Sequence, residues 1–166
     1  MTATTLVTPT PDEVCAAAAR RVHAVATTAP AAPLTQAVDA AIASIACRNP
    51  AQLIRWADGN GGAHVFIESA TLGGHYAQPI TWVAFHVPHT LPDGDIYPLW
   101  LRPDLSRIDG GPIGKVNAAG HNFLHQGQTW LSEPAVMVSL RSSDRDPRVD
   151  SPARKLARVL DIVRSS

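Results

Sequence analysis

Histidines are the residues of this chain best suited to chemistry, because seven occur and four of them form close pairs. His86 and His89 are three residues apart. His121 and His125 are four residues apart, so on a helix they would face one side, as the ligands of many zinc sites do. No Glu follows His121, and an extended strand would not place His86 and His89 on one face. The four histidines are therefore one candidate set of zinc ligands, and hydrogen-bonded loop histidines are the alternative.

The other motifs that could carry chemistry are weaker. Cys15 and Cys47 both fall in segments with helical periodicity, and a thiolate near a helix C-terminus is disfavoured by the helix dipole. We expect two reduced, buried thiols. The chain has no Gly-x-Ser-x-Gly elbow, and its glycine-rich residues 110–115 lack the Gly-Lys-Ser/Thr of a phosphate-binding loop. Zinc is therefore the one cofactor that the sequence suggests, and the simpler expectation is no cofactor.

Composition bears on which partners the protein can bind. Lys and Arg together number 14, as do Asp and Glu together, so the formal net charge is zero. This balance argues against nucleic-acid binding through the charge of the whole domain. No apolar run reaches the roughly 20 residues that span a bilayer. The N-terminus lacks the basic and apolar blocks of an export signal. We expect a cytoplasmic protein with no nucleic-acid or membrane partner.

Helices are expected to open the chain. Residues 1–9 are Thr-rich without periodicity, which predicts a flexible tail before a single domain over 10–166. Thr10, Pro11 and Glu13 form a helix start with a capping box, and this helix is expected to end near residue 27.

Two more helices are expected before the sheet. An amphipathic stripe predicts a second helix over 33–49, and a short third helix is expected over 50–58. Residues 10–59 therefore form the predicted helical part.

Beyond residue 60 the apolar spacing changes from nearly four to two, which is typical of strands. Strands are expected over 63–72, 79–87 and 97–102. Both faces of residues 81–87 are largely apolar. This predicts that other elements pack against both faces of the strand, or that an element packs against one face and a loop covers the other.

The remaining residues are expected to form a long surface loop over 106–120, a short strand over 135–140 and a closing helix capped by Ser151. The fold class is thus α+β, an antiparallel β-meander of three to four strands packed against N-terminal and C-terminal helices.

Residues around the third strand are candidates for protein binding, since aromatic and Arg side chains left exposed near a long loop mark such surfaces. The candidates are Tyr97, Trp100, Arg102 and Asp104.

The order of these elements resembles the ubiquitin-conjugating enzyme (UBC/RWD-like) fold. Residues 80–87, Ile-Thr-Trp-Val-Ala-Phe-His-Val, resemble that family's second strand, and Tyr97-Pro98 resembles the Tyr-Pro that begins its third. The resemblance covers residues 63–163 and is nearest to divergent bacterial members, some of which are encoded beside ubiquitin-like and defence genes.

One departure from the family changes what the resemblance implies. The family's His-Pro-Asn motif and catalytic cysteine should follow the third strand, where this chain has Arg102-Pro103-Asp104-Leu105 and no later cysteine. Because thioester transfer needs a thiol, the resemblance implies a non-catalytic domain, or a rebuilt site in which His121 is the catalytic candidate. The expected partner is a ubiquitin-like protein or its activating enzyme, bound by the helical part and residues 103–120.

Two functions of other classes remain open. One is a small histidine-dependent or zinc-dependent enzyme that uses the paired histidines. The other is a structural or assembly subunit whose N-terminal helices pair with another chain.

Overall fold

Three helices and seven strands make up the described part of the chain. A computed structural model describes residues 8–25, 33–125, 128–141, 146–147 and 149–166, and within 117–133 it describes the backbone alone. The helices are α1 Pro11–Ala19, α2 Gln36–Arg48 and α3 Pro152–Arg164. The strands are β1 Val22–Ala24, β2 Ile54–Gly59, β3 Gly62–Thr71, β4 Ile80–Val87, β5 Leu99–Leu101, β6 Val116–His125 and β7 Gln128–Val138.

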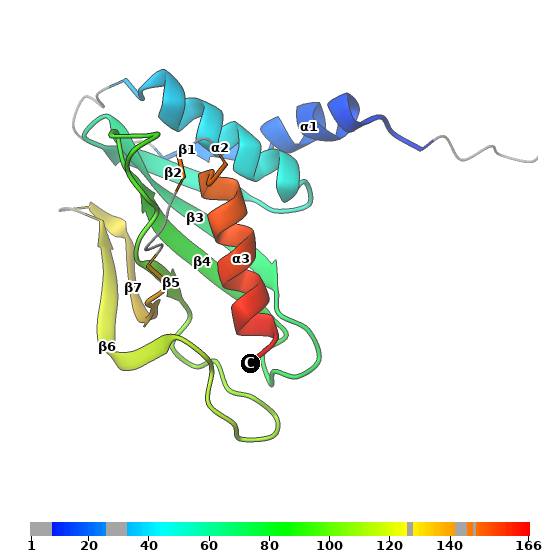
Figure 1. Cartoon of the computed structure of the whole chain (residues 1–166), viewed down its shortest axis with the longest axis vertical. Helices are drawn as coiled ribbons and strands as arrows, with labels where there is room; N and C mark the ends of the chain where they lie inside the picture. Colours follow the sequence, from blue (N-terminus) through cyan, green and yellow to red (C-terminus); the bar gives the residue numbers. More distant parts are fainter. Residues whose placement is uncertain (1–7, 26–32, 126–127, 142–145, 148) are drawn as a thin grey trace, which may run out of the picture.

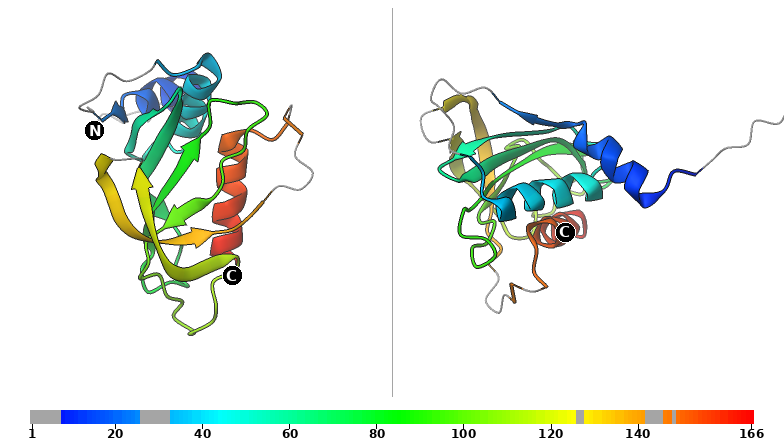
Figure 2. Two further views of the ribbon diagram at one scale, coloured as in Figure 1. Left: turned by 90° about the vertical axis from the view of Figure 1, so that its left-hand side faces the viewer. Right: turned by 90° about the horizontal axis from the view of Figure 1, so that it is seen from above.

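The strands form one mixed sheet in the order β1-β2-β3-β4-β5-β7-β6. β2 to β5 are antiparallel neighbours in chain order, whereas β1 lies parallel to β2 at one edge. β7 pairs with β5, so that β6 forms the other edge. α2 and α3 lie across one face of the sheet, and α1 projects at a corner (Figures 1 and 2). The predicted α+β class is confirmed, but the sheet is larger than a meander of three to four strands, and it is mixed.

Alternation along the central strands separates two apolar clusters. On the helix side, Val65, Phe85 and Leu99 are fully buried together with residues of α2 and α3. On the other side Phe66 and Ala84 are buried with Ala135, and Trp82 and Trp100 pack against them. Residues 81–87 therefore have apolar contacts on both faces, as their sequence predicts.

Of the three described helices, α1 and α3 have their N-caps where the sequence predicts them. Thr10 accepts a hydrogen bond from the Glu13 amide at 3.3 Å, and the Glu13 carboxylate accepts one from the Thr10 amide at 2.7 Å. Ser151 caps α3 by accepting from the Arg154 amide at 3.3 Å. These helix starts can be predicted from the sequence because all the groups involved lie within four residues of one another.

The N-terminal helices are shorter and fewer than expected. α1 ends at Ala19 rather than near residue 27, and the chain then enters β1. Residues 54–59 form β2 instead of a third helix. Ile54 and Trp56 contact the core with a period of two, and a segment this short gives similar apolar patterns for a helix and a strand. Pairing decides the outcome: β2 pairs with β3 through a tight turn and with β1, which is distant in sequence.

The C-terminal half also contains more strand than expected. The loop after β5 ends at Val116, where β6 begins, so the predicted loop over 106–120 is too long. β6 pairs with β7, which begins earlier than the predicted strand at 135–140 and ends at Val138, so only residues 135–138 of that prediction lie in a strand. Most of the predicted tail, residues 1–7, lies outside the described residues.

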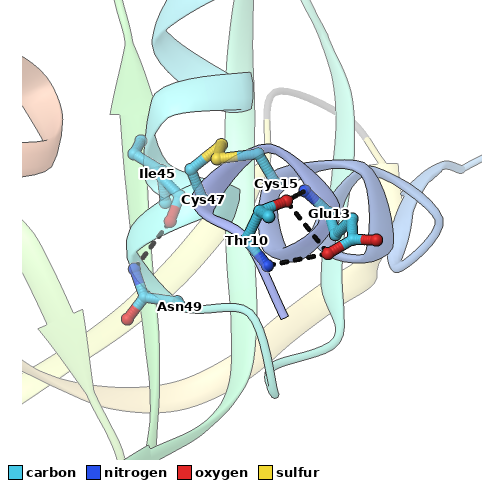
Figure 3. Close-up of a disulfide and its surroundings, with 6 residues drawn as sticks. All are labelled: Thr10, Glu13, Cys15, Ile45, Cys47 and Asn49. Atoms are coloured by element: carbon cyan, nitrogen blue, oxygen red, sulfur yellow. Dashed lines mark hydrogen bonds between the residues drawn. A yellow bond between two sulfur atoms is a disulfide. The ribbon is translucent and has the colours of Figure 1, made fainter. Parts of the chain in front are cut away.

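A disulfide joins α1 to α2, which corrects the expectation of two reduced, buried thiols. Cys15 and Cys47 are 32 residues apart in the sequence, and their Cα atoms lie 4.6 Å apart. Both side chains are half-buried, and the bond bridges the two helices (Figure 3). Residue spacing alone could not reveal this pair, because it depends on how α1 packs against α2 in three dimensions.

We expect the double substitution Cys15→Ser/Cys47→Ser to lower the free energy of unfolding by about 3–4 kcal/mol, since a cross-link over 32 residues restricts the unfolded chain. Urea denaturation of oxidised protein measures this loss. The double variant must be insensitive to a dithiol reductant. A loss under about 0.5 kcal/mol would contradict the cross-link.

We expect Tyr76→Phe to lower the free energy of unfolding by about 1 kcal/mol. Tyr76 is buried in the β3–β4 connection, and its hydroxyl donates a hydrogen bond to the Val163 carbonyl of α3. Removing the hydroxyl deletes this hydrogen bond and leaves the carbonyl with the longer contact of 3.4 Å from the Ser166 amide. Urea denaturation is the measurement, with Tyr97→Phe as a partly exposed control that should change stability less.

Candidate functional site

Two loops meet at the end of the molecule where the chain's C-terminus lies (Figure 1). One is the β3–β4 connection, residues 72–79, and the other is residues 102–115, between β5 and β6. The Ala77 amide donates to the Ser106 carbonyl at 2.9 Å, and the Ile108 amide donates to the His75 carbonyl at 2.9 Å. The Gly114 amide donates to Ser166 Oγ at 2.9 Å, which links the second loop to the C-terminus. Main-chain hydrogen bonds therefore hold both loops in place.

Two Arg-x-Asp pairs stiffen the second loop. Arg102 donates to both carboxylate oxygens of Asp104, at 2.6 and 2.7 Å. Arg107 does the same with Asp109, through one bond of 2.8 Å and a second from Nη2 to Oδ2. Bidentate pairs of this kind fix the orientation of both side chains. Both carboxylates are thus engaged within the loop.

The same contacts set the charge of the carboxylates. The Arg107 guanidinium, followed by the Gly111 amide, holds the pKa of the Asp109 carboxyl well below its usual range. The Arg102 guanidinium likewise lowers the pKa of Asp104. Both acids are therefore ionised at neutral pH, which suits a structural role better than general acid catalysis.

Glycines allow the turn around Asp109. Gly110 has a φ of +70°, a conformation that other residues rarely adopt. At Gly111, an added Cβ would lie 3.0 Å from Arg107 Nε and 3.1 Å from Asp109 Oδ1. The Gly-Gly sequence therefore lets the chain pass tightly around the Arg107–Asp109 pair.

The second loop covers an apolar hollow of about 370 Å³. Its apolar wall includes Leu105 and Ile113 from the loop, Val116 from the start of β6 and Val136 from β7. Arg107 and the two glycines lie at its polar side. Ile108, on the same loop, is 69% exposed. We call the hollow, including Leu105 and Ile113 in its wall, and the exposed Ile108 the loop-end surface.

The structure separates the four predicted binding residues. Arg102 and Asp104 lie together where the second loop begins. Tyr97 precedes β5 at its opposite end, where its hydroxyl lies 3.0 Å from Ser139 Oγ and the Arg141 guanidinium covers its ring. Trp100 faces the side of the sheet away from the helices. Arg102 and Asp104 thus lie beside the loop-end surface, and their binding role stays a prediction.

The predicted metal ligands are only partly described. His86 packs against His64 of the neighbouring strand, with ring centroids 4.6 Å apart, and His89 is exposed in the loop that follows. In the part of the chain that the structure describes, no group of three His, Cys, Asp or Glu residues could hold a metal ion.

His121 and His125 lie on a strand, not on a helix, so their spacing does not give the helical zinc geometry. Their side chains lie outside the described residues. A catalytic role for His121 and a ligand role for either residue therefore stay predictions.

Sequence reasoning missed the Arg107–Asp109 pair and the hollow. The repeated Arg-x-Asp pattern, at 102–104 and again at 107–109, is a local signal that could have indicated the pairs. The hollow has no such signal, because residues from the loop and from β7 line it.

We expect the Gly111 amide resonance to titrate with Asp109 at a pH below the ordinary aspartate value of about 3.9. Because the folded-state pKa of Asp109 is depressed, the pair's contribution is present above that ordinary value and is lost as the pH falls through the folded pKa. NMR titration of the folded protein measures the midpoint. Asp109→Asn should abolish this transition, and a midpoint at or above the ordinary value would contradict the pairing.

Comparisons with known proteins do not assign the chain. No protein-family model, no curated protein and no solved structure matches it. Among the described helices, none has the length and apolar character needed to cross a membrane. The family resemblance, the cytoplasmic location and the ubiquitin-like partner therefore stay predictions.

Proposed function

We propose that this chain is a ubiquitin-conjugating-like, non-catalytic domain that binds a protein partner through the loop-end surface. The observation that carries the proposal is the apolar hollow beneath an internally paired loop, with exposed Ile108 beside it. An apolar side chain of a partner could enter this hollow, and fully burying one Leu or Ile contributes about 1.5–3 kcal/mol. The proposed function is recognition, not turnover.

The chemistry available in the chain supports a non-catalytic role. Cys15 and Cys47 are the two cysteines of the sequence, and both are consumed in the bond between α1 and α2. Neither follows β5, where the resemblance would require a thiol to carry a thioester. Asp104 and Asp109 are ionised and paired with arginines of the same loop, so they orient the loop and do not supply a proton.

Element order supports the choice of partner. β2 to β5 are antiparallel neighbours, Tyr97-Pro98 leads into β5, and the second loop follows β5. If the resemblance holds, this loop corresponds to the family's catalytic loop. On this resemblance the partner is a ubiquitin-like protein or its activating enzyme, within a bacterial ubiquitin-like or defence system. The exposed apolar side chain of Ile108 would then contact the partner, while paired Arg102 and Arg107 flank the contact.

Ile108→Asp tests this surface, because it places a charge on an exposed side chain without disturbing the core. We expect affinity for the partner to fall at least tenfold, about 1.4 kcal/mol, with the melting temperature unchanged. Biolayer interferometry against ubiquitin-like and activating proteins encoded near this gene measures the change.

The matched control is Val149→Asp, at a side chain 51% exposed in the segment before α3. Its affinity should equal that of the unsubstituted protein. Absence of binding to every such protein, or equal weakening by both substitutions, would remove the proposal.

A further inference from the structure

α1 makes little contact with the rest of the protein. Of its nine residues, Ala18 alone is buried, whereas α2 buries five and α3 buries seven. It projects at a corner of the fold, beside α2 and away from α3 (Figure 2). A helix this short is marginally stable in isolation, so its position depends on what fastens it.

The two ends of α1 are fastened differently. Beyond its C-terminus, the Arg21 carbonyl accepts from the Ile54 amide at 3.0 Å, and Arg21 Nη1 donates to the Ala51 carbonyl at 3.0 Å. These bonds and β1 fix the chain to β2. Near the N-terminus, the bonds between Thr10 and Glu13 are internal to the helix (Figure 3). Cys15, in the middle, is the covalent link to α2.

We infer that the Cys15–Cys47 bond is a redox-controlled cross-link whose reduction frees α1 while the sheet, α2 and α3 stay folded. This inference does not depend on the proposed function. It accommodates the disulfide in a protein expected to be cytoplasmic, where disulfides are mostly transient or redox-sensing.

Reduction needs a dithiol, such as a thioredoxin-type protein. One thiolate of the reductant attacks a sulfur of the bond and forms a mixed disulfide, and the other protein sulfur leaves as a thiolate. The second thiol of the reductant then attacks the mixed disulfide and releases the first protein sulfur. Two electrons and two protons pass to the protein, which gains two thiols, and the reductant becomes a disulfide. Both cysteines are partly exposed, which gives the reductant access.

The effect of reduction should be local because the rest of the fold has its own core. α2 keeps Val38, Ile42 and Ile45 buried against the sheet, and none of these contacts involves sulfur. α3 is held by its own apolar face, by a Lys155–Asp95 ion pair of 3.1 Å and by Tyr76. Loss of the cross-link therefore removes a restraint on α1 and leaves these contacts in place.

Hydrogen exchange with mass spectrometry on the full chain tests the inference. After addition of dithiothreitol, Pro11–Ala19 should lose its protection and exchange at least tenfold faster, whereas β3, β4 and α3 should stay protected, and reoxidation should restore the protection of α1. Cys15→Ser/Cys47→Ser should exchange quickly in α1 with or without the reductant. Unchanged exchange in α1, or loss of protection in β3, β4 and α3 together with α1, would overturn the inference.

Trypsin provides a second measurement, since Arg20 and Arg21 are exposed at the end of α1. In oxidised protein, a fragment cut there should stay attached through Cys15 and Cys47 and show the mass of the intact chain plus water. In reduced protein, cutting should be faster and should release the fragment. Release without a reductant, or equal cutting rates in the two states, would contradict the inference.

Discussion

The antiparallel pairing of β3 with β4 is the interaction on which the rest of the structure depends. Its register pairs Val65 with Phe85 on the helix side and Phe66 with Ala84 on the other side. A slip of one residue would exchange these faces, turning apolar side chains of the main core away from the helices. The same register sets the β3–β4 connection at the end of the molecule, where it meets the loop after β5. The position of the loop-end surface thus follows from how two strands bury both faces.

The loop-end surface combines charge pairs with apolar area. In the Arg102–Asp104 and Arg107–Asp109 pairs the carboxylates are exposed and the arginines are partly buried. Ion pairs near the surface add little stability, but the bidentate geometry restricts the loop. A restricted loop loses less conformational entropy on binding than a mobile one. The apolar hollow and Ile108 then supply area for a partner. We interpret the pairs as pre-organising the surface and the apolar side chains as the source of affinity.

Local signals in the sequence predicted the helix starts, the central strands and the closing helix. Thr10 and Ser151 act on amides three residues away, and β3 and β4 are apolar runs with largely buried faces, so both features can be predicted without the fold. β2 could not be separated from a helix, because its apolar pattern is too short to decide and β1, one of its two pairing partners, is distant in sequence. The disulfide and the hollow depend on the three-dimensional arrangement of segments. Among the predicted binding residues, Arg102 and Asp104 do lie beside the hollow, whereas Trp100 lies on another face.

The most direct test of protein recognition at the loop end is an NMR titration of the isotope-labelled protein with a ubiquitin-like protein encoded near its gene. Our account predicts that amide shifts change along residues 103–116 and in the β3–β4 connection, with the outer face of α2 unaffected. Shift changes confined to α1 and α2, or none at saturating partner, would contradict it.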